Sequence, residues 1–282
     1  MGLENTHTIA RVVVDPSNSD VVYVAATGHE WTANKERGLF KTTDGGKTWE
    51  KVLYISENAG ISDVVIDPTN SQTLYCTSWE RIRLKWGDPR TNDNTKHSGV
   101  WKSTDGGKNW KQINNGLPAP NHCGRIGIDL CKEKPNVLYL LLDNYEIAEK
   151  AKPGDKDAYG RQKKDVIKGA TVYRSDDSGE NWKQVSGQTE ETNKYMMRHS
   201  GTYGWVFGQI RVDPKDPEVI WTMGLFLNKS EDGGKTFKAI REMHMDHHGL
   251  WIDPNNPNYL LNVQDGGLSI SYDKRQKLAK SD

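Results

Sequence analysis

Short apolar runs separated by polar turns recur along the chain. Five such runs end in aspartate, and in four of them proline follows the aspartate; they cover residues 11–15, 61–67, 125–129, 209–213 and 250–253. A second apolar run follows each of them, at residues 21–25, 73–76, 137–141, 219–221 and 259–261. Because proline fixes φ at the second position of a turn, Asp-Pro is a strong turn signal. Each pair of runs therefore predicts an antiparallel hairpin.

A second repeat follows a third apolar run in each unit. It reads Ser/Thr-x-Asp-x-Gly-x-x-Trp/Phe, with four complete copies and a broken fifth at Ser271 that has Arg275 in the glycine position. The aspartate can accept hydrogen bonds from its own turn, the glycine can adopt positive φ, and the aromatic residue starts a return strand. We predict structural roles for Asp44, Gly46, Trp49, Asp105, Gly107, Trp110, Asp177, Gly179, Trp182, Asp232, Gly234 and Phe237.

The two repeats together define a unit of four antiparallel strands, which is the blade of a β-propeller. We predict an all-β fold, with residues 1–282 forming one propeller segment of about five blades. The approximate blades are 9–56, 57–115, 122–187, 205–242 and 246–274, followed by a tail at 275–282. Since the fifth blade lacks a recognisable fourth strand, we expect the chain to self-associate or to form part of a larger propeller.

Composition narrows the classes of function. Lysine plus arginine and aspartate plus glutamate both number 38, which does not predict a nucleic-acid partner. The chain has no apolar run long enough to insert into a membrane, and its first residues do not show the pattern of a signal peptide, so we expect neither feature in this sequence. Insertions at residues 79–98 and 144–168 lengthen the loops of two blades, and we expect a ligand to bind on that loop-bearing face or in the central channel. Residues 145–152 could form a short helical turn.

The sequence from Met243 to Gly249 is the densest group of chemically versatile side chains. On a strand, His244, Asp246 and His248 would share one face and His247 would take the other. Such a group could bind zinc or manganese, line the channel mouth as a polar or ligand-contacting patch, or simply face solvent. We expect no other cofactor.

Arginine and aromatic residues form the second candidate site. They suit carbohydrate or anionic ligands, although the tryptophans could instead pack between blades and the arginines solvate strand ends. The set comprises Arg11, His29, Trp31, Trp79, Arg81, Arg83, Arg125, Trp205 and Arg211. A glycoside hydrolase would need two carboxylates flanking the sugar. No spacing selects such a pair among Glu30, Asp63, Glu80, Asp143 and Asp246.

The repeated box resembles the BNR, or Asp-box, repeat of sialidase-like and sortilin-like propellers. Further passages, including GHEW, YGWVFGQIRVDP and HMDHHGLWIDPNNP, are most similar to the sortilin/VPS10-type propellers of bacterial proteins often labelled glycosyl hydrolase. The resemblance implies a secreted or cell-surface protein. We expect a binding or scaffold module for a protein, peptide or glycan, with a sialidase- or xyloglucanase-like glycoside hydrolase as the alternative.

Overall fold

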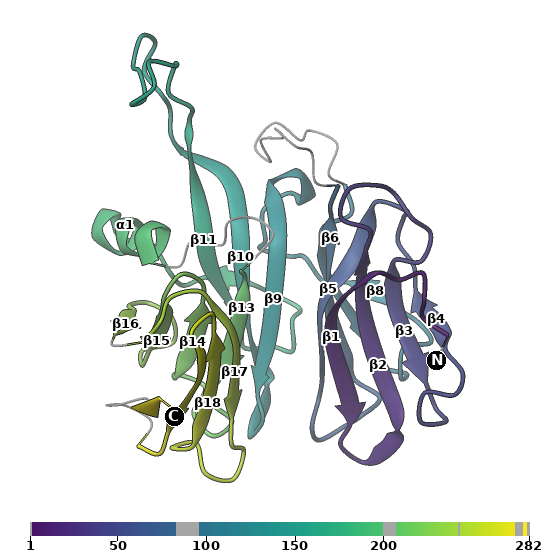
Figure 1. Cartoon of the computed structure of the whole chain (residues 1–282). Helices are drawn as coiled ribbons and strands as arrows, with labels where there is room; N and C mark the ends of the chain where they lie inside the picture. Colours follow the sequence, from purple (N-terminus) through teal and green to yellow (C-terminus); the bar gives the residue numbers. More distant parts are fainter. Residues whose placement is uncertain (1, 83–95, 200–206, 242, 274–278, 281–282) are drawn as a thin grey trace.

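Five antiparallel sheets of four strands each are arranged around a central channel in the computed structural model of the chain (Figure 1). The structure describes residues 2–82, 96–199, 207–241, 243–273 and 279–280. Strands follow one another in sequence within every sheet, so each blade is a simple meander. The prediction of an all-β propeller with five blades is confirmed.

Each blade contributes its first strand to the channel. The inner strands are β1 (Thr8–Asp15), β5 (Ala59–Ile66), β9 (Cys123–Cys131), β13 (Gln209–Val212) and β17 (His247–Ile252). The second strands are β2 (Asn18–Gly28), β6 (Leu74–Glu80), β10 (Lys134–Glu149), β14 (Ile220–Met223) and β18 (Leu260–Gln264). The third strands are β3 (Gly38–Thr42), β7 (Gly99–Ser103), β11 (Val166–Ser175), β15 (Leu227–Ser230) and β19 (Gly267–Ser271).

The outer strands are short. They are β4 (Glu50–Leu53), β8 (Lys111–Gln112), β12 (Lys183–Gln184), β16 (Lys238–Ile240) and β20 (Ala279–Lys280). The last of these corrects the sequence interpretation, because β20 pairs with β19 through Ser269–Lys280 and Ile270–Ala279. The fifth blade therefore has its fourth strand, even though the broken box before it lacks the glycine and the aromatic residue that mark the others.

The four complete boxes have the structural role that their sequence predicts. In the first, Oδ1 of Asp44 accepts hydrogen bonds from the backbone N–H groups of Lys47 and Thr48, at 3.0 and 2.9 Å. Asp105, Asp177 and Asp232 repeat this arrangement in their own turns. The fifth position of every box is a glycine with φ between 85 and 90°. These aspartates stabilise their turns, because their carboxylate oxygens accept hydrogen bonds from backbone N–H groups of the same turn.

Neighbouring blades pack face against face. We call the face of a blade that is turned to the preceding blade its leading face, and the one turned to the following blade its trailing face. Tyr23, Ala25 and Leu39 on the trailing face of blade 1 form one apolar cluster with Ile61 and Val64 on the leading face of blade 2. Similar clusters join blades 2 and 3, 3 and 4, and 4 and 5. This packing stabilises the array.

The insertion at residues 144–168 is an extension of the β10–β11 hairpin, which projects beyond the rest of the molecule (Figure 1). The expected helical turn at residues 145–152 is wrong, because β10 continues as far as Glu149 and pairs with Val166. Helix is found instead at α1 (Glu190–His199), where Met196 packs onto blades 3 and 4. A 3₁₀ turn, η2 (Pro120–His122), precedes β9.

Candidate ligand pocket in the central channel

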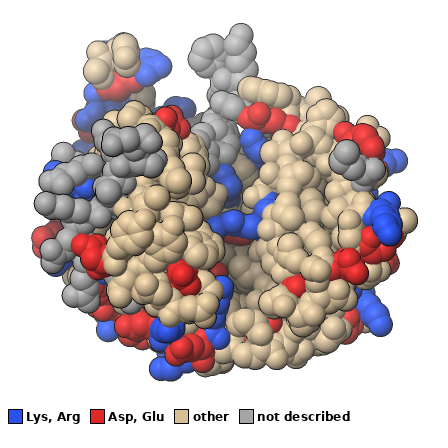
Figure 2. Space-filling model, turned by 60° about the horizontal axis from the view of Figure 1, so that its bottom comes forward, with Lys and Arg blue, Asp and Glu red and all other residues tan. Residues whose placement is uncertain are grey.

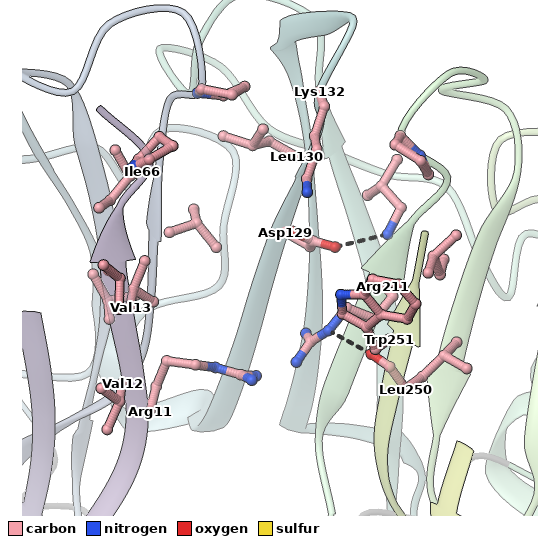
Figure 3. Close-up of a pocket in the computed structure, with 18 residues that line it drawn as sticks. Arg11, Val12, Val13, Ile66, Asp129, Leu130, Lys132, Arg211, Leu250 and Trp251 are labelled. Carbon is pink, nitrogen blue, oxygen red and sulfur yellow. Dashed lines mark hydrogen bonds between the residues drawn. The ribbon is translucent and has the colours of Figure 1, made fainter. Parts of the chain in front are cut away.

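A cavity of about 400 Å³ opens at the Asp-Pro end of the channel (Figure 3). The long β10–β11 hairpin lies at the opposite end of the molecule (Figure 1). Inner strands of all five blades line it, and the turn prolines Pro16, Pro68 and Pro214 form part of its rim. The side chains central to its chemistry are Arg11, Asp129, Lys132 and Arg211. We expected a ligand on the loop-bearing face or in the central channel, and this pocket lies in the channel, at the end away from the insertions.

Equivalent positions on the inner strands bring these polar side chains together. Arg11 in β1, Asp63 in β5 and Gln209 in β13 each pair with the buried central position of the second strand, opposite Ala25, Thr77 and Met223 respectively. Asp129 in β9 and Arg211 in β13 occupy the position two residues further along, opposite Tyr139 and Trp221. The repeat therefore places residues that are distant in sequence at two adjacent levels of one channel.

A hydrogen-bonded network crosses the channel at these levels. Nε of Arg11 forms an ion pair with Oδ1 of Asp63 at 2.8 Å. The side-chain oxygen of Gln209 accepts hydrogen bonds from Nη2 of Arg11 at 3.4 Å and from Nη2 of Arg211 at 3.2 Å. Nε of Arg211 also donates to the backbone oxygen of Leu250 at 3.2 Å (Figure 3). Two guanidinium groups from blades 1 and 4 thus meet at one neutral oxygen.

The network leaves positive charge in the cavity. Among the described residues that line it, Arg11, Arg211 and Lys132 are basic and Asp129 is acidic. Asp63 balances the charge of Arg11, whereas Arg211 donates its hydrogen bonds, within the described part of the chain, to uncharged oxygens. Figure 2 shows basic side chains inside the hollow at this end of the molecule. A desolvated cation without a bonded carboxylate is a good partner for an anionic ligand.

The charges perturb one another. The negative charge of Asp63 raises the pKa of Arg11. Burial opposes ionisation of Asp63, but the charges of Arg11 and Arg211 hold its pKa below the ordinary value. Burial lowers the pKa of Arg211 and raises that of Asp129. The pKa values of Asp63 and Asp129 are therefore displaced in opposite directions from the ordinary aspartate value.

Asp129 corrects one sequence interpretation. We placed it with the aspartates that end an inner strand at a turn, but β9 continues to Cys131, and Cys131 pairs with Lys134 across the turn. Asp129 lies within the strand, where Oδ2 accepts a hydrogen bond from the backbone N–H of Val212 at 2.9 Å (Figure 3). The missing proline after Asp129 was the signal that could have revealed this.

The other arginines and aromatic residues of the predicted site are dispersed. Burial lowers the pKa of Arg125 to about 10, and its side chain lies against Gly208. Trp79 is buried in β6, with the Arg81 guanidinium 4.9 Å from its ring centroid. Arg81 also forms an ion pair with Glu30 at 3.0 Å. Arg83 and Trp205 lie outside the described residues.

Two further candidates, His29 and Trp31, lie on a loop at the end of the blade away from the pocket's Asp-Pro turns. The His29 ring is 3.8 Å from that of His7, and its Nδ1 is 2.8 Å from the hydroxyl of Thr32. Trp31 is half-exposed. Of the predicted arginine and aromatic set, only Arg11 and Arg211 line the channel pocket that the structure describes.

The structure does not assemble the predicted metal site. Asp246 has φ of 67°, so the chain is not extended there, and β17 begins only at His247. His244 faces the backbone oxygen of Met245 and His248 is paired with Asp265 at 2.8 Å, so the side chains have separate partners. Nowhere in the described ranges do three His, Cys, Asp or Glu side chains converge as a metal ion would require. The described structure therefore does not bring His244, Asp246 and His248 together as metal ligands.

His247, which we assigned to the opposite face, is the buried member of this group. Its Nδ1 lies 2.8 Å from Oδ1 of Asn262, and burial lowers its pKa. The folded state then binds fewer protons than the unfolded state below the ordinary histidine pKa of 6.5. The contribution of His247 to the free energy of unfolding is therefore fully present above pH 6.5. It is lost as the pH falls below that value, by at most about 1.4 kcal/mol per pH unit.

We therefore expect the free energy of unfolding to fall between pH 7 and pH 5, and to fall less steeply in His247→Gln. Denaturant titrations of both proteins across this range measure the slopes. Carboxylates with lowered pKa values do not affect the comparison, because they are shared by both proteins. Equal slopes would show that His247 titrates normally in the folded state.

Comparison with known proteins agrees with this architecture. The family model described as BNR/Asp-box repeat matches residues 40–51, within the first blade. The chain carries a BNR/Asp-box repeat. It is 24% identical over 304 residues to xyloglucanase Xgh74A of Acetivibrio thermocellus, and 27% identical over 256 residues to a xyloglucanase of Hypocrea jecorina. The matches cover 84% and 82% of this chain but only 33% and 25% of those relatives.

Solved structures support the fold at low identity. The GH74 xyloglucanase of Xanthomonas campestris superposes with a TM-score of 0.56 and 18% identity, covering 96% of this chain and 37% of that one. YCF48 from Cyanidioschyzon merolae superposes with a TM-score of 0.52 and 17% identity, covering 98% of this chain and 69% of that one. Among the described residues, no helix has the length and apolar character needed to span a bilayer.

Proposed function

We propose that the chain is a binding module whose channel pocket takes a ligand bearing carboxylate groups, either an acidic peptide segment or an acidic glycan. The observation that carries this proposal is the convergence of Arg11 and Arg211, from blades 1 and 4, on a single glutamine oxygen inside the pocket. A bound carboxylate could accept hydrogen bonds from these guanidinium groups and compensate for their charge.

Several features support a small ligand segment in this place. The cavity of about 400 Å³ is in the range of pockets that hold a ligand rather than a single water molecule. Its walls are mostly valine, leucine and isoleucine, together with four charged side chains. Lys132, exposed at the rim, would attract the ligand from solution. The sortilin/VPS10 resemblance and the expected location outside the cell are compatible with such a receptor-like role.

Calorimetric titration tests the class of ligand directly. We expect a glutamate oligopeptide, an oligogalacturonide, or both to bind at about 0.05 M salt and to bind more weakly at about 0.5 M, because salt screens charges that remain accessible to solvent. The two ligands distinguish a peptide from a glycan. A neutral xyloglucan oligosaccharide should give no comparable heat. Binding of the neutral sugar alone, without salt dependence, would contradict the proposal.

Lys132 offers a clean test of where the ligand binds. Lys132→Glu reverses an exposed charge on the pocket lining, and we expect it to weaken binding of the acidic ligand about 10-fold. Lys134→Glu makes the same change in net charge two residues away, outside the pocket lining, and should bind nearly as the parent does. Equal weakening in both variants would indicate a nonspecific effect of net charge.

Hydrolysis of a glycan is the second candidate function. Its specific support is the pair Asp129 and Asp63, whose pKa values are displaced in opposite directions, as an acid and a base of a glycosidase would require. The similarity to xyloglucanases also favours a hydrolase. Against it, Asp63 is buried and bound to Arg11, and Asp129 accepts a backbone hydrogen bond.

We expect the parent protein to release no reducing ends from xyloglucan above the level of a blank. Reducing-sugar assays of the parent and of Asp129→Asn decide between the two functions. Asparagine can keep the hydrogen bond from Val212 but cannot donate a proton as an acid. Activity in the parent that disappears in Asp129→Asn, with unchanged thermal stability, would favour the hydrolase.

A further inference from the structure

The two end blades of the array expose faces that the blades between them bury. On the inner strands, the residues one and three positions before the turn belong to the leading face. In blades 2 to 5 these are Val64, Ile66, Ile128, Leu130, Ile210, Val212, Leu250 and Ile252, none of which is more than 8% exposed. In blade 1 the same positions hold Val12 and Val14, which are 57% and 50% exposed.

The trailing face of blade 5 is uncovered in the same way. In blades 1 to 4 the central cross-strand pairs of this face are Ala25–Leu39, Thr77–Val100, Leu141–Val172 and Met223–Leu227. Their members are at most 1% exposed. The equivalent pair of blade 5 is Val263–Leu268, whose members are 48% and 39% exposed. Blade 5 therefore has valine and leucine at positions that are buried in the other blades, although nothing in the described structure covers them.

Aromatic residues extend this uncovered surface. Trp251 in β17 is half-exposed, and its ring lies 5.9 Å from that of Tyr259. Tyr259 in turn stacks on Tyr272 at 5.2 Å. The open part of blade 1 is narrower, because Val24 in its second strand and Phe40 in its third strand are buried beside Leu3 and Trp49. The surface to be covered is therefore β1 on one side and β17 to β19 on the other.

These two surfaces border one opening. Val12 and Val14 from blade 1 and Trp251 from blade 5 line the same channel cavity. The strands that carry them lie on opposite sides of it (Figure 3). An occupant of this opening must offer apolar side chains in two directions, because it contacts a leading face on one side and a trailing face on the other.

We propose that the opening between blades 5 and 1 receives a β-sheet of the same construction as the five blades, with apolar side chains on both of its faces. The four internal interfaces are the template, since each pairs one trailing face with one leading face. Such a sheet would complete the channel wall beside the pocket. It would leave Arg11 and Arg211 turned toward the channel, and it would border the proposed ligand pocket, because Val12, Val14 and Trp251 also line that cavity.

A second copy of this chain fits the opening less well. Its fifth blade could cover β1, but its other four blades would have to continue around the ring. The curvature is already tight, because Arg11 of blade 1 reaches Gln209 of blade 4 across the channel. Four more blades following that curvature would collide with blade 5 of the first copy, whereas an isolated sheet would not.

Cysteine labelling tests the proposal, because Cys76, Cys123 and Cys131 are buried and give little background. Val12→Cys and Val263→Cys place a thiol on each open face. Tyr159→Cys is the control, since Tyr159 is 83% exposed on the β10–β11 hairpin. The rate of maleimide labelling is compared between two samples. One is the 282-residue chain purified alone, and the other is the protein isolated from its own host, where the proposed sheet can be present.

In the isolated chain we expect all three cysteines to react rapidly. In the host-produced protein we expect Val12→Cys and Val263→Cys to react at least 10-fold more slowly than Tyr159→Cys, which keeps its rate. A photoreactive residue at position 263 should cross-link to a strand of a blade-like sheet. Rapid labelling of both faces in the host-produced protein, or cross-links that join two copies of residues 1–282, would overturn the proposal.

Discussion

Replacing Arg37 by alanine should lower the free energy of unfolding by about 3 kcal/mol or more, because several buried carbonyl groups would lose their partner together. Arg37 is fully buried at the end of blade 1 opposite the pocket. Its Nη1 donates to the backbone oxygens of Thr27, Asn58 and Arg81 at 2.7 to 3.2 Å. Its Nη2 donates to those of His29 and Thr32.

Arg37 therefore joins the end of β2 in blade 1 to the residues that flank β5 and β6 in blade 2. The matched control is Arg161→Ala, since Arg161 is exposed and its ion pair with Asp157 is local to a hairpin tip. We expect this control to stay within about 0.5 kcal/mol of the parent. Urea denaturation of the three proteins gives the comparison, and similar midpoints for both variants would refute the structural role of Arg37.

Replacing Arg211 by glutamine should weaken binding of the acidic ligand by about 30-fold or more, because a buried charged partner is usually worth 2 kcal/mol or more at an interface. Glutamine keeps a donor near the oxygen of Leu250 but removes the charge. Isothermal titration measures the affinity, and the thermal midpoint is followed in parallel because Arg211 also contacts Gln209. A folded variant with unchanged affinity would place the ligand elsewhere.

Features that depend on short segments were predictable from the sequence. Each box gathers its whole mechanism within eight residues, so Asp44 and its three equivalents were assigned correctly as turn residues. The four-stranded blades followed from the order of apolar runs and turns. The fourth strand of blade 5 was not predictable in this way, because Ala279 and Lys280 carry neither an apolar pattern nor a box before them.

The channel network depends on register between blades, which one blade does not reveal. Arg11, Asp63 and Gln209 look unrelated in the sequence, and they meet only because they occupy equivalent pairing positions around the channel. The assignment of the histidines to strand faces was wrong for a local reason. The positive φ at Asp246 interrupts the alternation of side chains that this assignment assumed. Aspartate tolerates that conformation better than most residues, so its identity did not exclude a turn.

The crystal structure of the protein with a bound acidic ligand tests the account most directly. The account predicts that a ligand carboxylate lies within hydrogen-bond distance of Arg11 or Arg211, at the Asp-Pro end of the channel, with Lys132 at the rim. A ligand bound instead at the end that carries the β10–β11 hairpin, beside His29 and Trp31, with both channel arginines unchanged, would contradict it.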